Sequence, residues 1–264
     1  MTVDLQLAHT TAHAAARAAG EVLLRGFGSA HLDSESKSHR HDPVTVYDRL
    51  ADEAVRREIS AVFPEHGFLS EELGRTGDAS TPTWVIDPLD GTNNYLRRIP
   101  HFAVSIALRS EGRRLAACVY DPIRKETFAA LRGRQATLNG SPISVSRQIG
   151  LDGIVVAVGL SYRAEARRAT LDLLPALIEP ARALRTTGSA SLDLAYVAAG
   201  RFDVAWYPAL SEWDIAAGAL LIQEAGGRLT DLVGEDLVYP EHGLVASNGR
   251  VHDAFLQALH QESA

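Results

Sequence analysis

One apolar stretch that ends in closely spaced acids constrains this chain more than any other feature. Residues 84–92 read WVIDPLDGT, which predicts a buried strand that reaches the surface at Asp87. The proline-stiffened turn directs the Asp90 carboxylate to the same point, and two carboxylates this close repel each other unless a cation lies between them. The amides of Gly91 and Thr92 would begin a helix, where phosphate binds well. The stretch therefore predicts a divalent metal and a phosphate side by side.

The rest of the pattern divides the chain into an antiparallel-rich half, about 1–150, and an α/β half, about 151–264. In the first half, three strands joined by short turns predict an antiparallel meander. In the second half, strands and helices alternate. Because no linker-like stretch separates the halves, we expect residues 1–264 to form one unit of layered sheets and helices.

Helical and alternating periodicities give the expected elements. The expected helices are residues 5–27, 45–63, 164–178, 188–199, 213–225 and 251–259, with a short helical turn from residue 93. The expected strands are 68–73, 84–87, 101–109, 115–120, 127–131, 153–159, 183–185, 202–206, 228–230 and 244–246, and 74–82 is expected to be a loop.

Composition argues against several classes of protein. The formal net charge of −7 argues against a general nucleic-acid binder. Cys118 is the single cysteine, so no intramolecular disulfide can form and a reducing cytoplasm is the expected setting. Residues 1–7 lack a basic segment followed by an apolar one, and no apolar run of about 18 residues exists, so neither secretion nor membrane spanning is expected.

Acids recur where elements begin or end. These acids are Asp48, Glu71 with Glu72, Asp87 with Asp90, and Asp214. No cluster of Cys and His at zinc spacing accompanies them, so all-oxygen ligation predicts Mg²⁺, with Mn²⁺ as the alternative. Two or more such ions about 4 Å apart would suit an in-line displacement at phosphorus.

Each acidic segment also has a purely structural interpretation. Thr45 with Asp48 forms a capping-box pattern, the paired glutamates can be a solvated charge, and Asp214 at a helix start is favoured by the helix dipole. Residues 39–41, His-Arg-His, can be a metal site, but we interpret them as a solvated loop.

Phosphate also needs donors, and two helix starts rich in small residues can supply them. One is Gly91 with Thr92, and the other is the segment Gly188, Ser189, Ala190. Arg185, just upstream of the second, can add a charged contact or lie on the surface.

Two strings resemble signatures of the inositol monophosphatase family. Residues 84–95, WVIDPLDGTNNY, resemble the first signature, and residues 213–218, WDIAAG, followed by EAGG at 224–227, resemble the second. DPVT at 42–45 and LSEE at 69–72 match the other acidic segments of the family, and 185–200 resembles its bacterial branch. The order and spacing agree from about residue 5 to residue 259.

The resemblance implies a role for each acid. Glu71 and Asp87 would share one Mg²⁺ with the backbone carbonyl of Leu89, Asp87 with Asp90 and Asp214 would hold a second, and a third, weaker ion would also touch Glu71. Thr92, paired with Asp48, would orient and help deprotonate the attacking water. The implied catalytic set is Thr92, Asp48 and Glu71. The implied substrate-binding set is Asp90, Gly91, Thr92, Arg185, Gly188, Ser189, Ala190 and Tyr207.

The resemblance also implies an α/β (α+β) fold, a layered α/β/α/β/α sandwich of the inositol monophosphatase and fructose-1,6-bisphosphatase type. Members are usually homodimers, and lithium commonly inhibits them. The implied activity is Mg²⁺-dependent hydrolysis of a small polyol phosphate such as myo-inositol 1-phosphate.

One departure from the family pattern lies seven residues before Asp214. Members that act on inositol phosphates usually carry a glutamate there, whereas this chain has Tyr207. A phenol cannot supply a carboxylate, and Glu212 is a candidate substitute. The alternatives are a phosphatase for 3′-phosphoadenosine 5′-phosphate or histidinol phosphate, or a regulatory scaffold with protein or RNA partners.

Overall fold

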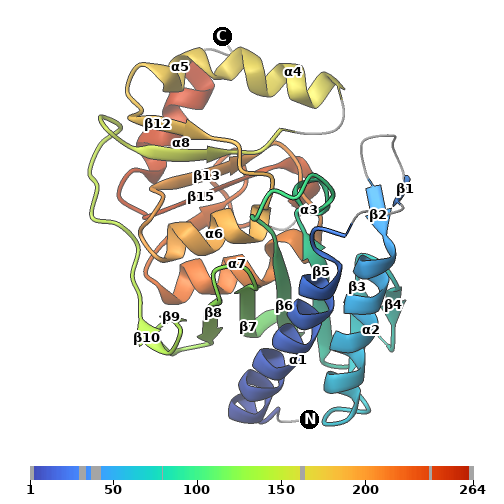
Figure 1. The fold of residues 1–264 in the computed structure, drawn as a ribbon. Helices are drawn as coiled ribbons and strands as arrows, with labels where there is room; N and C mark the ends of the chain where they lie inside the picture. Colours follow the sequence, from blue (N-terminus) through green and yellow to red (C-terminus); the bar gives the residue numbers. More distant parts are fainter. Residues whose placement is uncertain are drawn as a thin grey trace.

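Two large sheets alternate with three layers of helices along the molecule (Figure 1). The computed structural model describes residues 3–29, 34–36, 43–78, 80–160, 164–237 and 240–261. The histidine-rich segment at 39–41, and Asp42 of the DPVT string, lie outside the described residues. The order of layers confirms the predicted α/β/α/β/α sandwich, and no helix of the described residues is long and apolar enough to cross a membrane.

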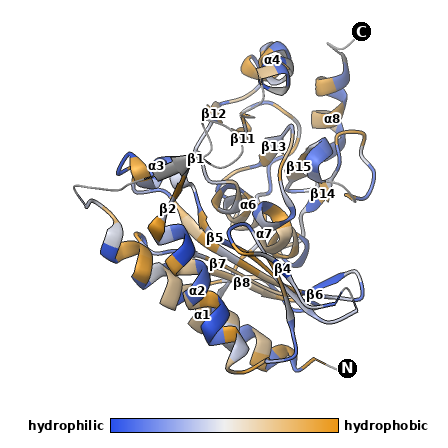
Figure 2. Ribbon diagram, turned by 90° about the vertical axis from the view of Figure 1, so that its right-hand side faces the viewer, coloured by the Kyte–Doolittle hydropathy of each residue, from blue (hydrophilic) through white to orange (hydrophobic). Residues whose placement is uncertain are grey.

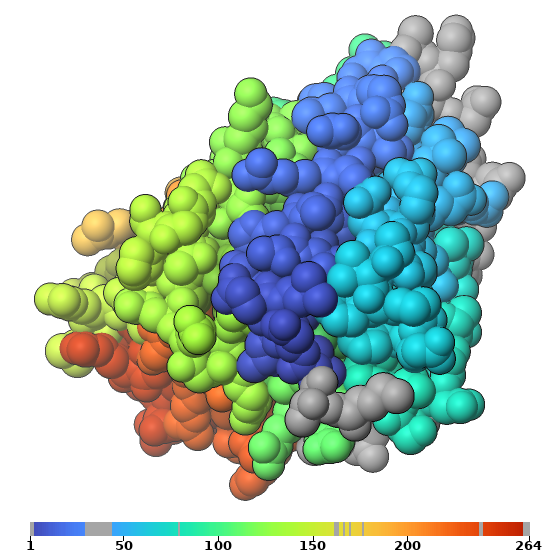
Figure 3. Space-filling model, turned by 90° about the horizontal axis from the view of Figure 1, so that it is seen from below, coloured from blue at the N-terminus to red at the C-terminus, as the bar shows by residue number. Residues whose placement is uncertain are grey.

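The first helical layer is an antiparallel pair, α1 (Leu5–Gly26) and α2 (Val46–Ser60). Figure 3 shows the two helices side by side on the surface, α1 in dark blue and α2 in cyan. The inward face of α1 consists largely of alanines that are fully buried, which lets the helix lie close to the sheet. The predicted capping box at Thr45 and Asp48 is present at the start of α2.

The larger sheet has eight strands in the order β10-β9-β8-β7-β6-β5-β3-β4. They are β3 (Gly67–Ser70), β4 (Gly74–Thr76), β5 (Thr83–Asp90), β6 (Ala103–Ser110), β7 (Arg113–Asp121), β8 (Glu126–Leu131), β9 (Thr137–Leu138) and β10 (Ser141–Pro142). Strands β6 to β8 form the predicted antiparallel meander, and β5 pairs antiparallel with β6. A separate two-stranded ribbon pairs β1 (Ser34–Ser36) with β2 (Pro43–Thr45).

The start of the larger sheet differs from the expectation in two ways. Strand β3 ends at Ser70, so Glu71 and Glu72 lie in a turn, and residues 74–76 form strand β4 where a loop was expected. That turn lets β4 fold back onto β3. Strand β3 is parallel to β5, with Ser70 opposite Ile86. The carboxyl ends of both strands therefore meet at one edge of the sheet.

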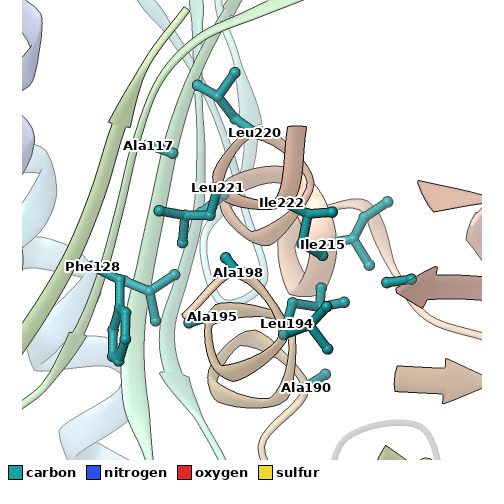
Figure 4. Packing of buried hydrophobic residues seen from close by; sticks show 14 of the residues in the cluster. Ala117, Phe128, Ala190, Leu194, Ala195, Ala198, Ile215, Leu220, Leu221 and Ile222 are labelled. Carbon is teal, nitrogen blue, oxygen red and sulfur yellow. The ribbon is translucent and has the colours of Figure 1, made fainter. Parts of the chain in front are cut away.

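The middle layer contains α6 (Ala190–Ala198) and α7 (Glu212–Glu224), which lie between the two sheets. Every residue of α6 is buried, as expected for a helix covered on all sides. Figure 4 shows Ala117 and Phe128 of the larger sheet against these helices, and Figure 2 shows the strands between α1 and α2 on one side and α6 and α7 on the other. A Cβ at Gly218 would lie 2.5 Å from the Leu194 side chain, so this glycine permits a close helix contact.

The smaller sheet has five strands in the order β12-β11-β13-β15-β14. They are β11 (Val155–Val158), β12 (Ala183–Arg185), β13 (Val204–Tyr207), β14 (Arg228–Thr230) and β15 (Leu244–Ser247). The outer layer is α4 (Ala164–Leu173), α5 (Pro175–Ile178) and α8 (His252–Gln261). The single helix expected at 164–178 is therefore wrong, because Pro175 cannot continue a helix and instead begins a new one.

His252 begins α8 and is buried between two hydroxyl groups. Its Nδ1 lies 2.8 Å from Ser247 Oγ, and its Nε2 lies 2.9 Å from Thr230 Oγ1. Burial lowers the pKa of His252 from 6.5 to about 4. Between these pH values the unfolded chain binds a proton that the folded chain does not, so this histidine makes the protein less stable as the pH falls from 6.5 to 4.

We therefore expect His252→Gln to reduce the acid sensitivity of folding. The variant should have a lower melting temperature than wild type at pH 7.5, because Gln cannot reach both hydroxyls, and should lose less stability between pH 7.5 and pH 5. Thermal unfolding at both pH values measures this. His260→Gln, at an exposed position on the same helix, is the control and should behave as wild type. An equal loss of stability in His252→Gln and wild type would contradict the account.

Candidate active site

The parallel pairing of β3 and β5 brings acids from two segments together. Glu71 directly follows β3, and its amide donates to Ile86 O at 3.2 Å. Asp87 and Asp90 lie near the end of β5, where the pairing with β6 shifts register between them. Such irregularities redirect side chains at sheet edges. Asp87 Oδ1 accepts from the Leu89 amide at 3.0 Å, which holds this carboxylate inside the turn.

Asp87 shows how closely the acids approach one another. Burial raises the pKa of Asp87 well above its ordinary value, and the charges of Glu71, Asp90 and Asp214 raise that pKa further. Three separate segments of the chain thus place four carboxylates close enough for their charges to repel one another. The cost of four such charges together falls when a cation joins them.

Asp214 lies in the first turn of α7, directly above β6. Its Oδ2 accepts from the Ser211 amide at 2.7 Å, within a capping box, and Ser105 Oγ contacts Trp213 O at 3.5 Å. Asp214 thus lies at a helix start, as the helix-dipole interpretation expects, and it also caps α7. These structural roles coexist with its position among the acids.

A hydrogen bond joins Asp48, on α2, to Thr92, which follows β5 of the larger sheet. Asp48 is 1% exposed, and its Oδ1 accepts from Thr92 Oγ1 at 3.1 Å. Thr92 Oγ1 also lies 3.1 Å from Leu89 O. Asp48 Oδ2 accepts from the Thr45 amide at 2.8 Å and from Thr45 Oγ1 at 2.6 Å. One carboxylate thus both caps α2 and holds the threonine that follows Gly91.

Asp90 joins β5 to the start of α6. Its Oδ2 accepts from Ser189 Oγ at 2.6 Å and from the Ser191 amide at 2.7 Å and hydroxyl, while Oδ1 accepts from the Ala190 amide at 3.2 Å. Each carboxylate oxygen has about two lone pairs. Oδ1 therefore keeps an acceptor site beyond its contact with the helix.

The two glycine segments proposed for phosphate lie next to each other. Gly91 has φ of 101°, and a Cβ there would lie 3.2 Å from Gly188 O and 3.1 Å from His101 O. Only glycine fits this backbone conformation and this space. Asn94, a residue that the sequence analysis missed, donates to Thr187 O and His101 O, each at 2.8 Å. Asn94 thereby fixes α3 (Thr92–Leu96) to the loop before α6.

Tyr207 lies at the end of β13 with only 7% of its surface exposed. Its hydroxyl donates to Asp193 Oδ2 at 2.5 Å, and Thr187 Oγ1 donates to Asp193 Oδ1 at 2.8 Å. Burial raises the pKa of Asp193 to about 7, although these two hydrogen bonds lower it. The sequence analysis missed Asp193, yet an acid within an otherwise apolar buried helix was a signal that it had a specific partner.

Two other candidate residues have partners outside this group of acids. Arg185 is exposed at the end of β12, and its guanidinium donates to Leu184 O at 3.0 Å. Glu212 forms an ion pair with Arg109 of β6. That ion pair joins Arg109 Nη1 to Oε1 of Glu212, and Glu212 remains a candidate substitute for the glutamate that Tyr207 replaces.

The donor chemistry of the acids fits Mg²⁺ or Mn²⁺, which favour carboxylate and carbonyl oxygen. Burial first, and then the charges of Glu71, Asp90 and Asp214, raise the pKa of Asp87, and a cation among these acids would offset both costs. Within the described ranges, no three His, Cys, Asp or Glu side chains already form a group that could hold an ion. The fit therefore rests on charge and donor type rather than on a preformed cage.

Known proteins resemble the chain over almost its whole length. It is 41% identical over 251 residues to the Nus factor SuhB of Pseudomonas aeruginosa, and 40% identical over 247 residues to an inositol-1-monophosphatase of Mesorhizobium japonicum, each match covering 93% of both chains. The crystal structure of the extragenic suppressor protein SuhB from Bartonella henselae matches with a TM-score of 0.91 and 38% identity, covering 95% of this chain and 97% of that one. The model of the inositol monophosphatase family matches residues 4–264. The chain therefore belongs to the inositol monophosphatase family.

Proposed function

We propose that this chain is a Mg²⁺-dependent phosphomonoesterase that hydrolyses a small polyol phosphate such as myo-inositol 1-phosphate. The observation that carries the proposal is that Glu71, Asp90 and Asp214 gather around the buried Asp87, next to the glycines at 91 and 188. Membership of the family supports it. We also infer a cytoplasmic, homodimeric enzyme that lithium inhibits, as is usual in this family.

The acids would hold two or three ions, Mg²⁺ or alternatively Mn²⁺. Glu71, Asp87 and the Leu89 carbonyl would hold one ion, Asp87, Asp90 and Asp214 a second, and Glu71 would contribute to a third. When bound, such ions supply positive charge to the phosphate and lower the pKa of water. Asp90 can take part because its Oδ1 has an acceptor site beyond the contact with Ala190.

The chain's own residues would position the attacking water and its proton. Thr92 Oγ1 has one proton and two acceptors, Asp48 Oδ1 and Leu89 O. Its own lone pair remains able to accept a proton from water, while the buried Asp48 carboxylate draws the threonine proton. Thr92 with Asp48 would thus act as a base, and Glu71 would complete the catalytic set.

The phosphate and the alcohol would lie over the adjoining glycine segments. Gly91, Thr92 and the segment Gly188 to Ala190 would receive the phosphate, with Asp90 beside it and Arg185 as an outer charged contact. Tyr207 would face the alcohol. Because its hydroxyl donates to Asp193, the phenol oxygen is left as an acceptor for a substrate hydroxyl, which a polyol supplies.

Phosphate release from a panel of monoesters tests the proposal. The panel contains myo-inositol 1-phosphate, a sugar phosphate, glycerol 2-phosphate, 3′-phosphoadenosine 5′-phosphate and histidinol phosphate. We expect Mg²⁺-dependent release that EDTA stops and fresh Mg²⁺ restores, with the highest kcat/KM for a polyol phosphate. A higher kcat/KM for the adenosine or histidinol compound would select that alternative. No release from any ester would contradict the proposal.

A second candidate function is a partner-binding role of the kind that the name Nus factor SuhB denotes. The observation that favours it is that the chain is about as similar to proteins of that name, at 41% identity, as to the inositol-1-monophosphatase, at 40%. Cells that lack the protein distinguish the two functions. Complementation by a catalytically inactive Asp87→Asn variant would assign the cellular role to binding, whereas complementation by wild type alone would assign it to hydrolysis.

A further inference from the structure

Asp52 is a buried acid that none of the roles above uses. It lies on α2, one helical turn after Asp48, and is 0% exposed. Its carboxylate accepts from three groups: the hydroxyl of Ser70, the amide of Leu73 at 3.2 Å and Nε of Arg56 at 2.9 Å. Two of these donors lie on either side of Glu71. Asp52 therefore reaches from α2 to the turn that carries a proposed metal ligand.

The turn itself is organised around the Asp52 and Ser70 side chains. Ser70 Oγ donates to Asp52 and accepts from the amides of Glu72 and Leu73, each at 3.3 Å. On the other side, the Glu71 amide donates to Ile86 O in β5. The backbone of Glu71 is thus held by the sheet on one side and by α2 on the other.

Arg56 holds Asp52 in place. Besides its bond to Asp52, its Nη2 donates to Gly74 O at 3.0 Å, and its guanidinium lies 4.9 Å from the centre of the Phe68 ring. Arg56 therefore joins α2 to both β3 and β4. With Asp52 fixed in this way, the Ser70–Leu73 turn has little freedom to move relative to α2.

We propose that Asp52 is a positioning residue that sets the location of Glu71 in the metal centre. This inference rests on the proposed function. Residues 48 and 52 are four apart and lie on one face of the helix. A single face of α2 thereby holds Thr92 through Asp48 and the Glu71 turn through Asp52, which fixes the proposed base relative to the proposed metal ligands.

The test is Mn²⁺ binding, measured from the electron paramagnetic resonance signal of the free ion, together with phosphate release. In Asp52→Asn we expect Mn²⁺ affinity to fall about 10- to 100-fold, the range for partners that orient metal ligands. At saturating metal, kcat should stay within about threefold of wild type, because the reacting groups remain. A purely structural role would lower the melting temperature without this split between metal affinity and kcat.

Asp203→Asn is the matched control. Asp203 is also a buried aspartate, and it accepts from the Ser146 hydroxyl at 2.5 Å and the Val155 amide at 2.8 Å, but it directly precedes β13 of the smaller sheet. This variant should lose stability and keep the Mn²⁺ affinity of wild type. Ser70→Ala, which keeps the Asp52 charge, should weaken Mn²⁺ binding less than Asp52→Asn, and the double variant should be no weaker than Asp52→Asn because the two act as a unit.

The outcomes distinguish the role of Asp52 from the proposed function. Wild-type affinity in folded Asp52→Asn, or an equal loss in Asp203→Asn, would overturn the role of Asp52 while leaving the proposed function intact. If Asp52→Asn does not fold, Ser70→Ala decides by the same measurement. A wild-type protein that neither binds Mn²⁺ nor releases phosphate would overturn the proposed function itself.

Discussion

Replacing Asp87 by Asn should abolish hydrolysis and at the same time raise the melting temperature of the metal-free protein. The loss of activity should exceed about 100-fold, the upper end for residues that only orient metal ligands. Stability should rise because burial and the charges of Glu71, Asp90 and Asp214 raise the pKa of Asp87. An ionised Asp87 therefore destabilises the fold, and a neutral amide of the same shape removes that cost while still accepting from the Leu89 amide.

The direction of the pH dependence follows from the same pKa shift. The folded chain holds the Asp87 proton to a higher pH than the unfolded chain does. The metal-free wild type should therefore lose stability as the pH rises from about 4 through the raised pKa of Asp87. In Asp87→Asn this part of the loss is absent. The gain in melting temperature should then be larger at pH 8 than at pH 5, with each kcal/mol relieved worth about 2–4 °C.

Thermal unfolding with EDTA and with Mg²⁺, combined with phosphate release, checks these expectations. Mg²⁺ should stabilise wild type, because a ligand that binds only the folded state shifts the unfolding equilibrium, and should stabilise Asp87→Asn much less. Asp231→Asn, an aspartate that accepts from the Val233 and Glu235 amides in an exposed turn, is the control for acid-to-amide exchange. A less stable Asp87→Asn protein in EDTA at pH 8 would show that the acids do not repel each other as proposed.

Replacing Thr92 by Ala should lower kcat about 10²- to 10⁴-fold, the usual contribution of a positioned acid or base. The reason is the 3.1 Å contact between Thr92 Oγ1 and Asp48 Oδ1, which the variant loses. Asp48→Asn should lower kcat by a similar factor. The double variant should be no slower than the slower single variant, because the effects of residues that act as a unit are not additive. Thr92→Ser, which keeps the hydroxyl, should retain most of the activity.

Thr45→Ala separates this catalytic role from the structural role of Asp48. It removes the capping partner of Asp48, at a cost of about 0.5–2 kcal/mol in stability, and leaves Thr92 and Asp48 in contact. Its kcat should stay within about threefold of wild type. If Thr45→Ala slows the reaction as much as Asp48→Asn does, the proposed base is wrong and Asp48 acts only by capping α2.

The local pattern of apolar and polar residues predicts much of this fold, because the pattern within each element follows which of its residues are buried. The alternation along β5 places Trp84 and Ile86 against α1 and α2 and Val85 towards α6 and α7. Asp87 and Asp90 lie near the end of the same strand, so the acids at this edge were visible in the sequence. Pro175 was visible too, but the expectation of one helix over residues 164–178 did not take it into account.

Partners far apart in the chain could not be predicted in the same way. Asp90 contacts Ser189, 99 residues later, and Glu212 pairs with Arg109, 103 residues earlier. A helix or strand periodicity extends over only a few residues, so it cannot reveal such pairs. They depend on how the two sheets enclose α6 and α7. The contact of Tyr207 with Asp193 spans only 14 residues but joins β13 to α6. It changes the chemical interpretation of Tyr207 from a lost carboxylate to a phenol held by one.

The central claim is that four acids from three segments act together as a metal centre. Calorimetric titration of Mg²⁺ into the metal-free protein at pH 7.5, with wild type and Asp87→Asn compared under the same conditions, tests it most directly. The account predicts at least two binding events in wild type and the loss of at least one in Asp87→Asn. No binding to wild type, or the same binding in both proteins, would contradict it.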